Sequence, residues 1–166
     1  MNVAALAARY DTVALEGSDG TGKSSLARQL ADRHGFQVVH SPRTPDAVAL
    51  TGRYKELLAK PGRLVLDRCF VSELVYGPLY RDGSRLTWAQ TLELVDLVTT
   101  RRGVLVHLTA SPLVIHARLL QRDGTAPPLS EIAELTAAYE QAFHTISSHA
   151  EVVTFGPEPD TPCATG

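Results

Sequence analysis

Gly17-Ser18-Asp19-Gly20-Thr21-Gly22-Lys23-Ser24 fits the pattern GxxxxGK[ST] at every fixed position. Glycines in such a loop let backbone N–H groups turn inward around phosphate oxygens, and a helix that begins at its end adds a partial positive charge. Lys23 would then bridge the β- and γ-phosphates of a nucleotide, and the Ser24 hydroxyl would ligate Mg²⁺. The stretch therefore predicts a site for ATP with Mg²⁺.

The segments around this loop predict an α/β fold. Short runs rich in Val and Leu alternate with longer segments of helical spacing, a pattern typical of a parallel sheet covered by helices. We expect a three-layer P-loop NTPase fold, with a five-stranded parallel sheet flanked by helices and a short lid. The expected strands are residues 12–16, 37–41, 63–67, 104–109 and 152–155, and the expected helices are residues 23–34, 47–59, 71–80, 87–101, 112–121 and 130–148.

Two of the expected helices have start signals in the sequence. Ser111 can cap a helix whose first residue is Pro112, and Ser130 can cap one with Glu131 in its first turn. In the last helix, apolar residues recur every three or four positions and predict one buried face. These residues are Ile132, Leu135, Tyr139, Phe143 and Ile146.

Length and composition favour one domain that stays in solution. At roughly 150 residues per domain, 166 residues form about one. We expect it over residues 1–156, with a lid near residues 121–129 and a disordered tail over 157–166. Two cysteines form no disulfide framework and have no metal-ligand spacing to the histidines, and no apolar run approaches a membrane span. These features predict a cytoplasmic protein without a membrane partner.

Charge argues against non-specific nucleic-acid binding, because a net charge of −2 creates no field that attracts polyanions.

A carboxylate at the end of a strand, Asp67, is placed to order the water shell of the metal. Four arginines fall at expected strand ends or in the lid, where open α/β sheets bind ligands. They are Arg43, Arg68, Arg118 and Arg122.

Several cations around one phosphate site indicate a small phosphotransferase, because the transition state spreads negative charge over oxygens kept from water. A GTPase would need an NKxD-type loop, which the chain lacks, and motor ATPase domains are usually longer. The predicted ATP-binding residues are Gly17, Ser18, Asp19, Gly20, Thr21, Gly22, Lys23, Ser24, Ser25 and Arg118. The predicted metal ligands are Ser24 and Asp67.

The chain resembles the thymidylate kinase-like branch of the P-loop nucleoside and nucleotide kinases. Residues 15–25 resemble the EGxDGxGKST signature, and Asp67-Arg68 with Ser72 and Tyr76 resembles a DR-xxx-S-xxx-[YF] segment. The similarity continues through residues 108–112, includes Arg118 and Arg122, and reaches Tyr139 in the last helix. It spans most of residues 12–155.

The resemblance implies a set of substrate contacts. By position, Asp19 would meet the sugar hydroxyl of an acceptor nucleotide, and Arg68 would bind phosphate between donor and acceptor. Ser72 and Tyr76 would line the acceptor pocket. Residues 41–45 are similar to the REPGG segment of the family, so Arg43 would bind the acceptor phosphate.

The resemblance also assigns the catalytic set. The family has an arginine either in the phosphate loop or in the lid, and since Gly20 occupies the loop position, the assignment falls on Arg122. The implied catalytic residues are Lys23, Asp67, Arg68 and Arg122. The stretch between Arg43 and Asp67 is shorter than in the family and lacks the segment that stacks on thymine and reads its carbonyl, so thymine specificity does not carry over.

Transfer of the γ-phosphoryl group of ATP to a (deoxy)nucleoside monophosphate is the leading interpretation. A hydroxyl acceptor, such as a deoxynucleoside or a hydroxymethylated base in DNA, is the alternative, with Asp67 or Asp19 as base. Relatives that act on nucleosides usually have a Glu after the second strand, where this chain has residues 40–43, HSPR. An ATP-binding regulator without chemistry is a third possibility. Family members often form dimers, so a homodimer is also possible.

Overall fold

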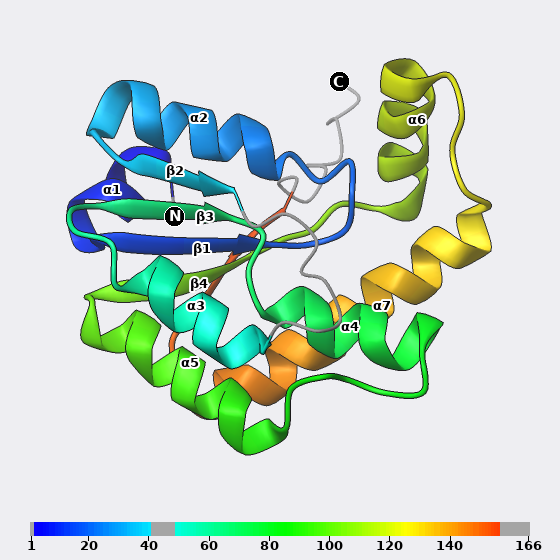
Figure 1. Ribbon diagram of the computed structural model, residues 1–166. Helices are drawn as coiled ribbons and strands as arrows, with labels where there is room; N and C mark the ends of the chain where they lie inside the picture. Colours follow the sequence, from blue (N-terminus) through cyan, green and yellow to red (C-terminus); the bar gives the residue numbers. More distant parts are fainter. Residues whose placement is uncertain (1, 41–48, 157–166) are drawn as a thin grey trace.

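Residues 2–40 and 49–156 are described by the computed structural model of the chain (Figure 1). The strands are β1 (Thr12–Glu16), β2 (Gln37–His40), β3 (Leu64–Asp67), β4 (Gly103–Leu108) and β5 (Val152–Phe155). The helices are α1 (Val3–Arg9), α2 (Lys23–His34), α3 (Leu50–Leu58), α4 (Val71–Tyr80), α5 (Trp88–Thr100), α6 (Pro112–Asp123) and α7 (Leu129–Ser147). Arg43 and the tail 157–166 lie outside the described residues.

The five strands form one parallel sheet, as expected from the sequence, and their order in it is β2-β3-β1-β4-β5. β1 lies at the centre, and Leu15 is in register with Asp67 of β3 and Val106 of β4. The chain leaves β1 for the β2–β3 side and later crosses to the β4–β5 side. The carboxyl ends of β1, β3 and β4 therefore meet where the strand order reverses, which is where such sheets bind ligands.

Helices cover both faces of the sheet. Figure 1 shows α1 and α2 on one face and α3, α4, α5 and α7 on the other. All of β1 is buried, and its residues alternate between the two cores: Val13 and Leu15 pack in the α1–α2 core, whereas Ala14 packs in the other. The next residue on that second face is Glu16, so the strand directs a carboxylate toward α4 and α7.

The cap expected for α6 is confirmed, whereas the one expected for α7 is wrong. The Ser111 side chain accepts a hydrogen bond from the Val114 N–H, and Pro112 is the first helical residue. α7 begins at Leu129 after Pro128, so Ser130 lies inside its first turn and no side chain among the described residues caps it. With Pro128 at the boundary, the helix begins two residues earlier than it would with Ser130 as its cap.

The structure also contains α1, which the sequence analysis did not predict. Asn2 caps this seven-residue helix by accepting from the Ala5 N–H, and Leu6 and Ala7 are its buried residues. A helix this short has too little hydrophobic periodicity to be recognised and depends on packing against the sheet. The apolar face expected on α7 is confirmed: Ile132, Tyr139, Phe143 and Ile146 are buried, and Leu135 is half-buried.

α6 extends two residues beyond the expected end and terminates at Gly124, whose left-handed conformation closes the helix. Residues 124–128 then connect it to α7, so the expected lid comprises the last turn of α6, this connection and the start of α7. Ile115 and Leu119 pack with Ile132 in a small core of their own. None of the described helices has the length and apolar character needed to cross a membrane.

Candidate active site

The phosphate loop connects β1 to α2 and is shaped by two glycines. At Gly17, φ is 148°, and a Cβ there would lie 2.1 Å from the Leu108 carbonyl oxygen, so only glycine fits. Gly22 precedes α2 with φ of 100°, and no described side chain caps that helix. The first N–H groups of α2 therefore face the loop without a side-chain acceptor, which is the arrangement that binds phosphate.

Lys23 is held inside this loop. Its ammonium group donates to the carbonyl oxygens of Gly17 at 2.7 Å and Ser18 at 2.8 Å, and its side chain is 6% exposed. Burial, followed by the positive charge of Arg68, lowers the pKa of Lys23. The two carbonyl contacts hold the charge where the sequence motif predicts the phosphates of a nucleotide.

Ser24 and Asp67 meet as predicted for a metal site. The Ser24 hydroxyl donates to Asp67 Oδ2 at 2.8 Å, and His40 Nδ1 lies 3.6 Å from the same oxygen. A hydroxyl and a carboxylate oxygen are the ligand types that Mg²⁺ prefers, with phosphate oxygens and water to complete the shell. Among the described residues no cluster of three or more His, Cys, Asp or Glu side chains forms a metal cage.

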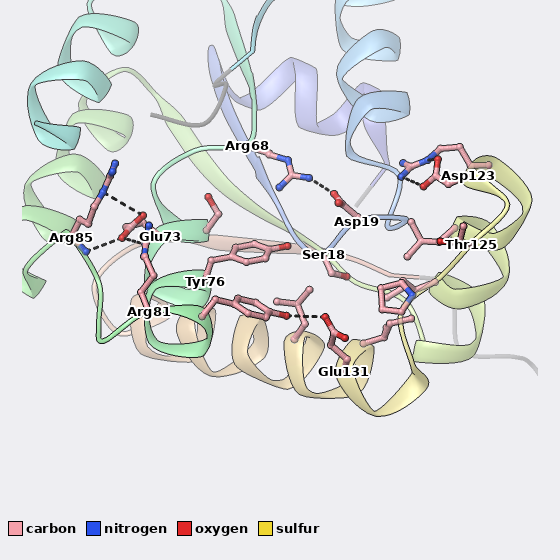
Figure 2. Close-up of a pocket in the computed structure, with 18 of the residues that line it drawn as sticks. Ser18, Asp19, Arg68, Glu73, Tyr76, Arg81, Arg85, Asp123, Thr125 and Glu131 are labelled. Atoms are coloured by element: carbon pink, nitrogen blue, oxygen red, sulfur yellow. Dashed lines mark hydrogen bonds and ion pairs between the residues drawn. The ribbon is translucent and has the colours of Figure 1, made fainter. Parts of the chain in front are cut away.

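Arg68 follows β3 and pairs with the phosphate loop. Its guanidinium group donates to Asp19, as Figure 2 shows, and its φ of 72° is unusual for a residue with a side chain. Asp19 also lies 4.0 Å from the Lys23 ammonium group. Asp19, Lys23 and Arg68 are thus neighbours in the structure.

Arg118 and Arg122, the two arginines predicted in or next to the lid, lie on α6 but make different contacts. Arg118 donates to the Gly20 carbonyl oxygen at 3.1 Å and so contacts the phosphate loop directly. Arg122 instead pairs with the adjacent Asp123, through contacts of 2.6 and 2.7 Å. This pair is exposed, and exposed ion pairs contribute little to stability, so Arg122 can exchange Asp123 for a phosphate.

Two cavities adjoin at this edge of the sheet. The phosphate-loop cavity, about 870 Å³, is lined by residues 19–25 with His40 and Asp67. The α4 cavity, about 910 Å³, lies beside α4, α6 and α7 and includes the predicted Ser18, Ser72 and Tyr76 (Figure 2). Both cavities are lined by the same three charged residues, Asp19, Arg68 and Arg122.

The α4 cavity also contains residues that the sequence analysis did not select. Tyr76 and Tyr80 stack with ring centroids 5.7 Å apart, and Tyr80 donates to Glu131 of α7 at 3.2 Å. Figure 2 shows Glu73 at another part of the cavity, where it accepts from the side chain of Arg81 and, at 2.8 Å, from the Arg85 N–H. The spacing of Tyr76 and Tyr80, four residues apart on one helix, was a usable signal.

Glu16 is a further residue to which the sequence analysis gave no role. It is completely buried at the end of β1, and its Oε1 accepts from the backbone N–H groups of Cys69 and Ser72 at 2.8 and 2.9 Å. Burial raises the pKa of Glu16, and the two N–H contacts oppose that rise. A charged residue that directly follows the apolar run of β1 was the signal for it.

Comparisons with solved structures find the same fold in several kinases. The crystal structure of the YorR protein of Bacillus subtilis in complex with phosphorylated GDP matches with a TM-score of 0.71 and 24% identity, over 87% of this chain and 84% of that one. Deoxyadenosine kinase of M. mycoides with bound dCTP matches with 0.59 and 14% identity, over 90% and 92%. Shikimate kinase of Acinetobacter baumannii in complex with shikimate matches with 0.54 and 18% identity, over 93% and 87%.

Sequence comparison leads to the same relative. The chain is 27% identical over 142 residues to the SPbeta prophage-derived uncharacterized protein YorR of Bacillus subtilis (strain 168), covering 82% of this chain and 84% of that protein. No family model matches the chain. These likenesses establish the fold.

Proposed function

We propose that this chain is a kinase that transfers the γ-phosphoryl group of ATP, with Mg²⁺, to the phosphate of a (deoxy)nucleoside monophosphate, in the manner of the thymidylate kinase-like branch. The observation that carries this proposal is the sharing of Asp19, Arg68 and Arg122 by the two cavities. A donor on the phosphate loop and an acceptor beside α4 would meet at these charges. The activity then depends on positioning, for which two adjoining sites are the main requirement.

The cations around the junction support transfer between phosphates. Lys23, Arg68 and Arg122 would stabilise the negative charge that spreads over the migrating group. An acceptor phosphate is already ionised near neutral pH, so no strong general base is needed. Ser24 and Asp67 would hold Mg²⁺, which neutralises charge on the β- and γ-phosphate oxygens when bound.

The α4 cavity supports a planar, partly polar acceptor. Ser72 and Tyr76 line it, as the resemblance to the family implies, and Tyr80 extends its aromatic surface. Aromatic side chains stack on nucleobases. The complex of YorR with phosphorylated GDP is consistent with a nucleotide ligand for this chain as well. Arg43, the residue expected to bind the acceptor phosphate, lies outside the described residues.

A nucleoside hydroxyl is the second candidate acceptor, and the position of the Asp19 carboxylate favours it. Its carboxylate is half-exposed at the junction, where it can accept a proton once Arg68 turns to a phosphate. The likeness to a deoxyadenosine kinase points the same way. A hydroxymethylated base in DNA belongs to this class of acceptor.

Phosphate transfer from labelled ATP to a panel of mononucleotides, nucleosides and hydroxymethylated DNA separates the candidates. We expect labelled nucleoside diphosphates from at least one mononucleotide, with an absolute requirement for Mg²⁺. Labelling of nucleosides or DNA without labelling of mononucleotides would replace the leading candidate with the second. Tight ATP binding without transfer to any acceptor would favour a regulator.

A further inference from the structure

Glu16 connects the phosphate loop to the segment that contains Arg68. It is the last residue of β1 and immediately precedes Gly17, the first residue of the loop. Its Oε1 accepts from two backbone N–H groups in the corner between β3 and α4, those of Cys69 and Ser72. One carboxylate oxygen thus connects two segments that are more than fifty residues apart in sequence.

The corner between β3 and α4 depends on this contact. α4 has Phe70 as its N-cap, and no described side chain of the corner itself caps the helix. Ser72 is the second residue of α4, so its N–H is one of those a helix leaves without an internal partner. Glu16 therefore caps α4 from another strand and places negative charge at the positive end of the helix.

Arg68 lies directly beside this contact in a strained conformation. Its φ of 72° is unfavourable for a residue with a Cβ, so the surrounding structure must hold it. The N–H of the next residue, Cys69, is held by Glu16, and the Arg68 N–H donates to the Leu15 carbonyl oxygen at 3.2 Å. Both contacts come from the end of β1.

We propose that Glu16 is a positioning residue, whose buried carboxylate fixes the corner between β3 and α4 against the phosphate loop and so keeps Arg68 between the two cavities. The proposal rests on the proposed function, since it concerns the residue that would bind phosphate between donor and acceptor. Glu16 itself contacts no substrate, because its side chain is 0% exposed. It acts through Arg68 and through the start of α4.

The main alternative is that Glu16 accepts a proton in the reaction. The positioning role depends on the length of the side chain, whereas the proton-accepting role depends on its charge. Glu16→Gln keeps the reach and one acceptor oxygen but removes the charge. Its new N–H₂ group would replace Oε2, which has no hydrogen-bond partner within the described structure. Tyr139 Oη is likewise buried and unpartnered there, and the Glu16 charge, after burial, raises the pKa of Tyr139. Glu16→Asp keeps the charge but is one methylene shorter.

The experiment measures Glu16→Gln, Glu16→Asp and Glu16→Leu against Ile146→Ala. Ile146 is fully buried in α7, away from both cavities, so its truncation is a control for loss of stability alone. For each variant, amide hydrogen exchange at Cys69 and Ser72 is followed by NMR, binding of Mg-ATP by calorimetry, and kcat and KM by the transfer assay. The exchange measurement is independent of whether the chain is an active kinase.

We expect Glu16→Gln to keep slow exchange at both amides and kcat/KM for the acceptor within about threefold. Glu16→Asp and Glu16→Leu should expose both amides and lower kcat/KM for the acceptor at least tenfold, with Mg-ATP affinity changed less than about threefold. Ile146→Ala should leave both amides protected and kcat/KM within about threefold. This pattern would support a role that depends on reach.

Three results would overturn the positioning role. The first is a Glu16→Gln variant that loses activity while Glu16→Asp retains it, which indicates a role for the charge. The second is exchange at both amides unchanged in Glu16→Leu. The third is a parallel fall in Mg-ATP affinity, which indicates that Glu16 shapes the phosphate loop instead. Absence of transfer by the unaltered protein contradicts the proposed function, and the exchange result then decides the contact on its own.

Discussion

Lys23 is a buried cation with two carbonyl groups as its partners, Gly17 and Ser18. Neutral partners compensate a buried charge less well than an anion does, so a phosphate at this position would bind it more strongly. We expect Lys23→Ala to slow turnover at least about a hundredfold, or roughly 2.7 kcal/mol, and to weaken Mg-ATP binding. Steady-state kinetics and calorimetry measure the two effects.

Lys55 provides the matched control for Lys23. It is a half-exposed lysine on α3 whose partner is Glu93, and it lines neither cavity. Lys55→Ala removes the same charge and should leave turnover and nucleotide affinity unchanged within about twofold. Equal effects of the two substitutions would contradict a specific role for Lys23.

Asp67 is expected to attract Mg²⁺ through its charge. Because its carboxylate already accepts from the Ser24 hydroxyl, Asp67→Asn should keep this hydrogen bond while removing the charge that attracts Mg²⁺. We expect the Mg²⁺ concentration for half-maximal activity to rise at least tenfold, with the thermal midpoint nearly unchanged. A magnesium titration of the transfer rate tests this. An unchanged titration curve would remove Asp67 from the metal site.

Arg122, in the last turn of α6, is the residue through which this helix is expected to contact the transferred phosphate. The Arg122–Asp123 pair is exposed at the last turn of the helix, and the same arginine lines both cavities. We expect Arg122→Ala to slow turnover at least about a hundredfold and to leave Mg-ATP affinity within about threefold, because its contact forms mainly in the transition state. Gln121→Ala, a change at the preceding exposed position, should have no effect. Turnover of Arg122→Ala equal to that of the unaltered chain would contradict the lid assignment.

Elements differ in how far local sequence predicts them. Ser111 and Pro112 predicted the start of α6, because both residues act on the helical turn that follows them. The start of α4 has no such signal, because its cap comes from Glu16 on a different strand. The phosphate loop and Asp67 were predictable for the same reason that α6 was: each belongs to a short motif whose parts act locally. The α4 cavity was only partly predictable: the helical spacing of Tyr76 and Tyr80 was a local signal, whereas Glu73 lines the cavity through tertiary packing.

At the scale of the whole molecule, the sheet and α7 are joined around a buried histidine. His107 of β4 is 5% exposed and stacks on Phe143 of α7 with ring centroids 4.5 Å apart. Burial lowers the pKa of His107 to about 4, from 6.5. Between these two values the unfolded chain binds a proton that the folded chain does not, so this residue lowers the stability as the pH falls.

The expected stability contribution of His107 is fully present above about pH 6.5 and is lost progressively as the pH falls toward 4. Linkage gives a loss of about 2 kcal/mol between pH 7.5 and pH 5. Urea unfolding at the two pH values measures the total change, which includes other groups. His107→Phe preserves an aromatic ring against Phe143 but cannot take up a proton, so the difference between the two chains isolates the histidine. If His107→Phe and the unaltered chain lose the same stability over this range, His107 does not link the fold to pH.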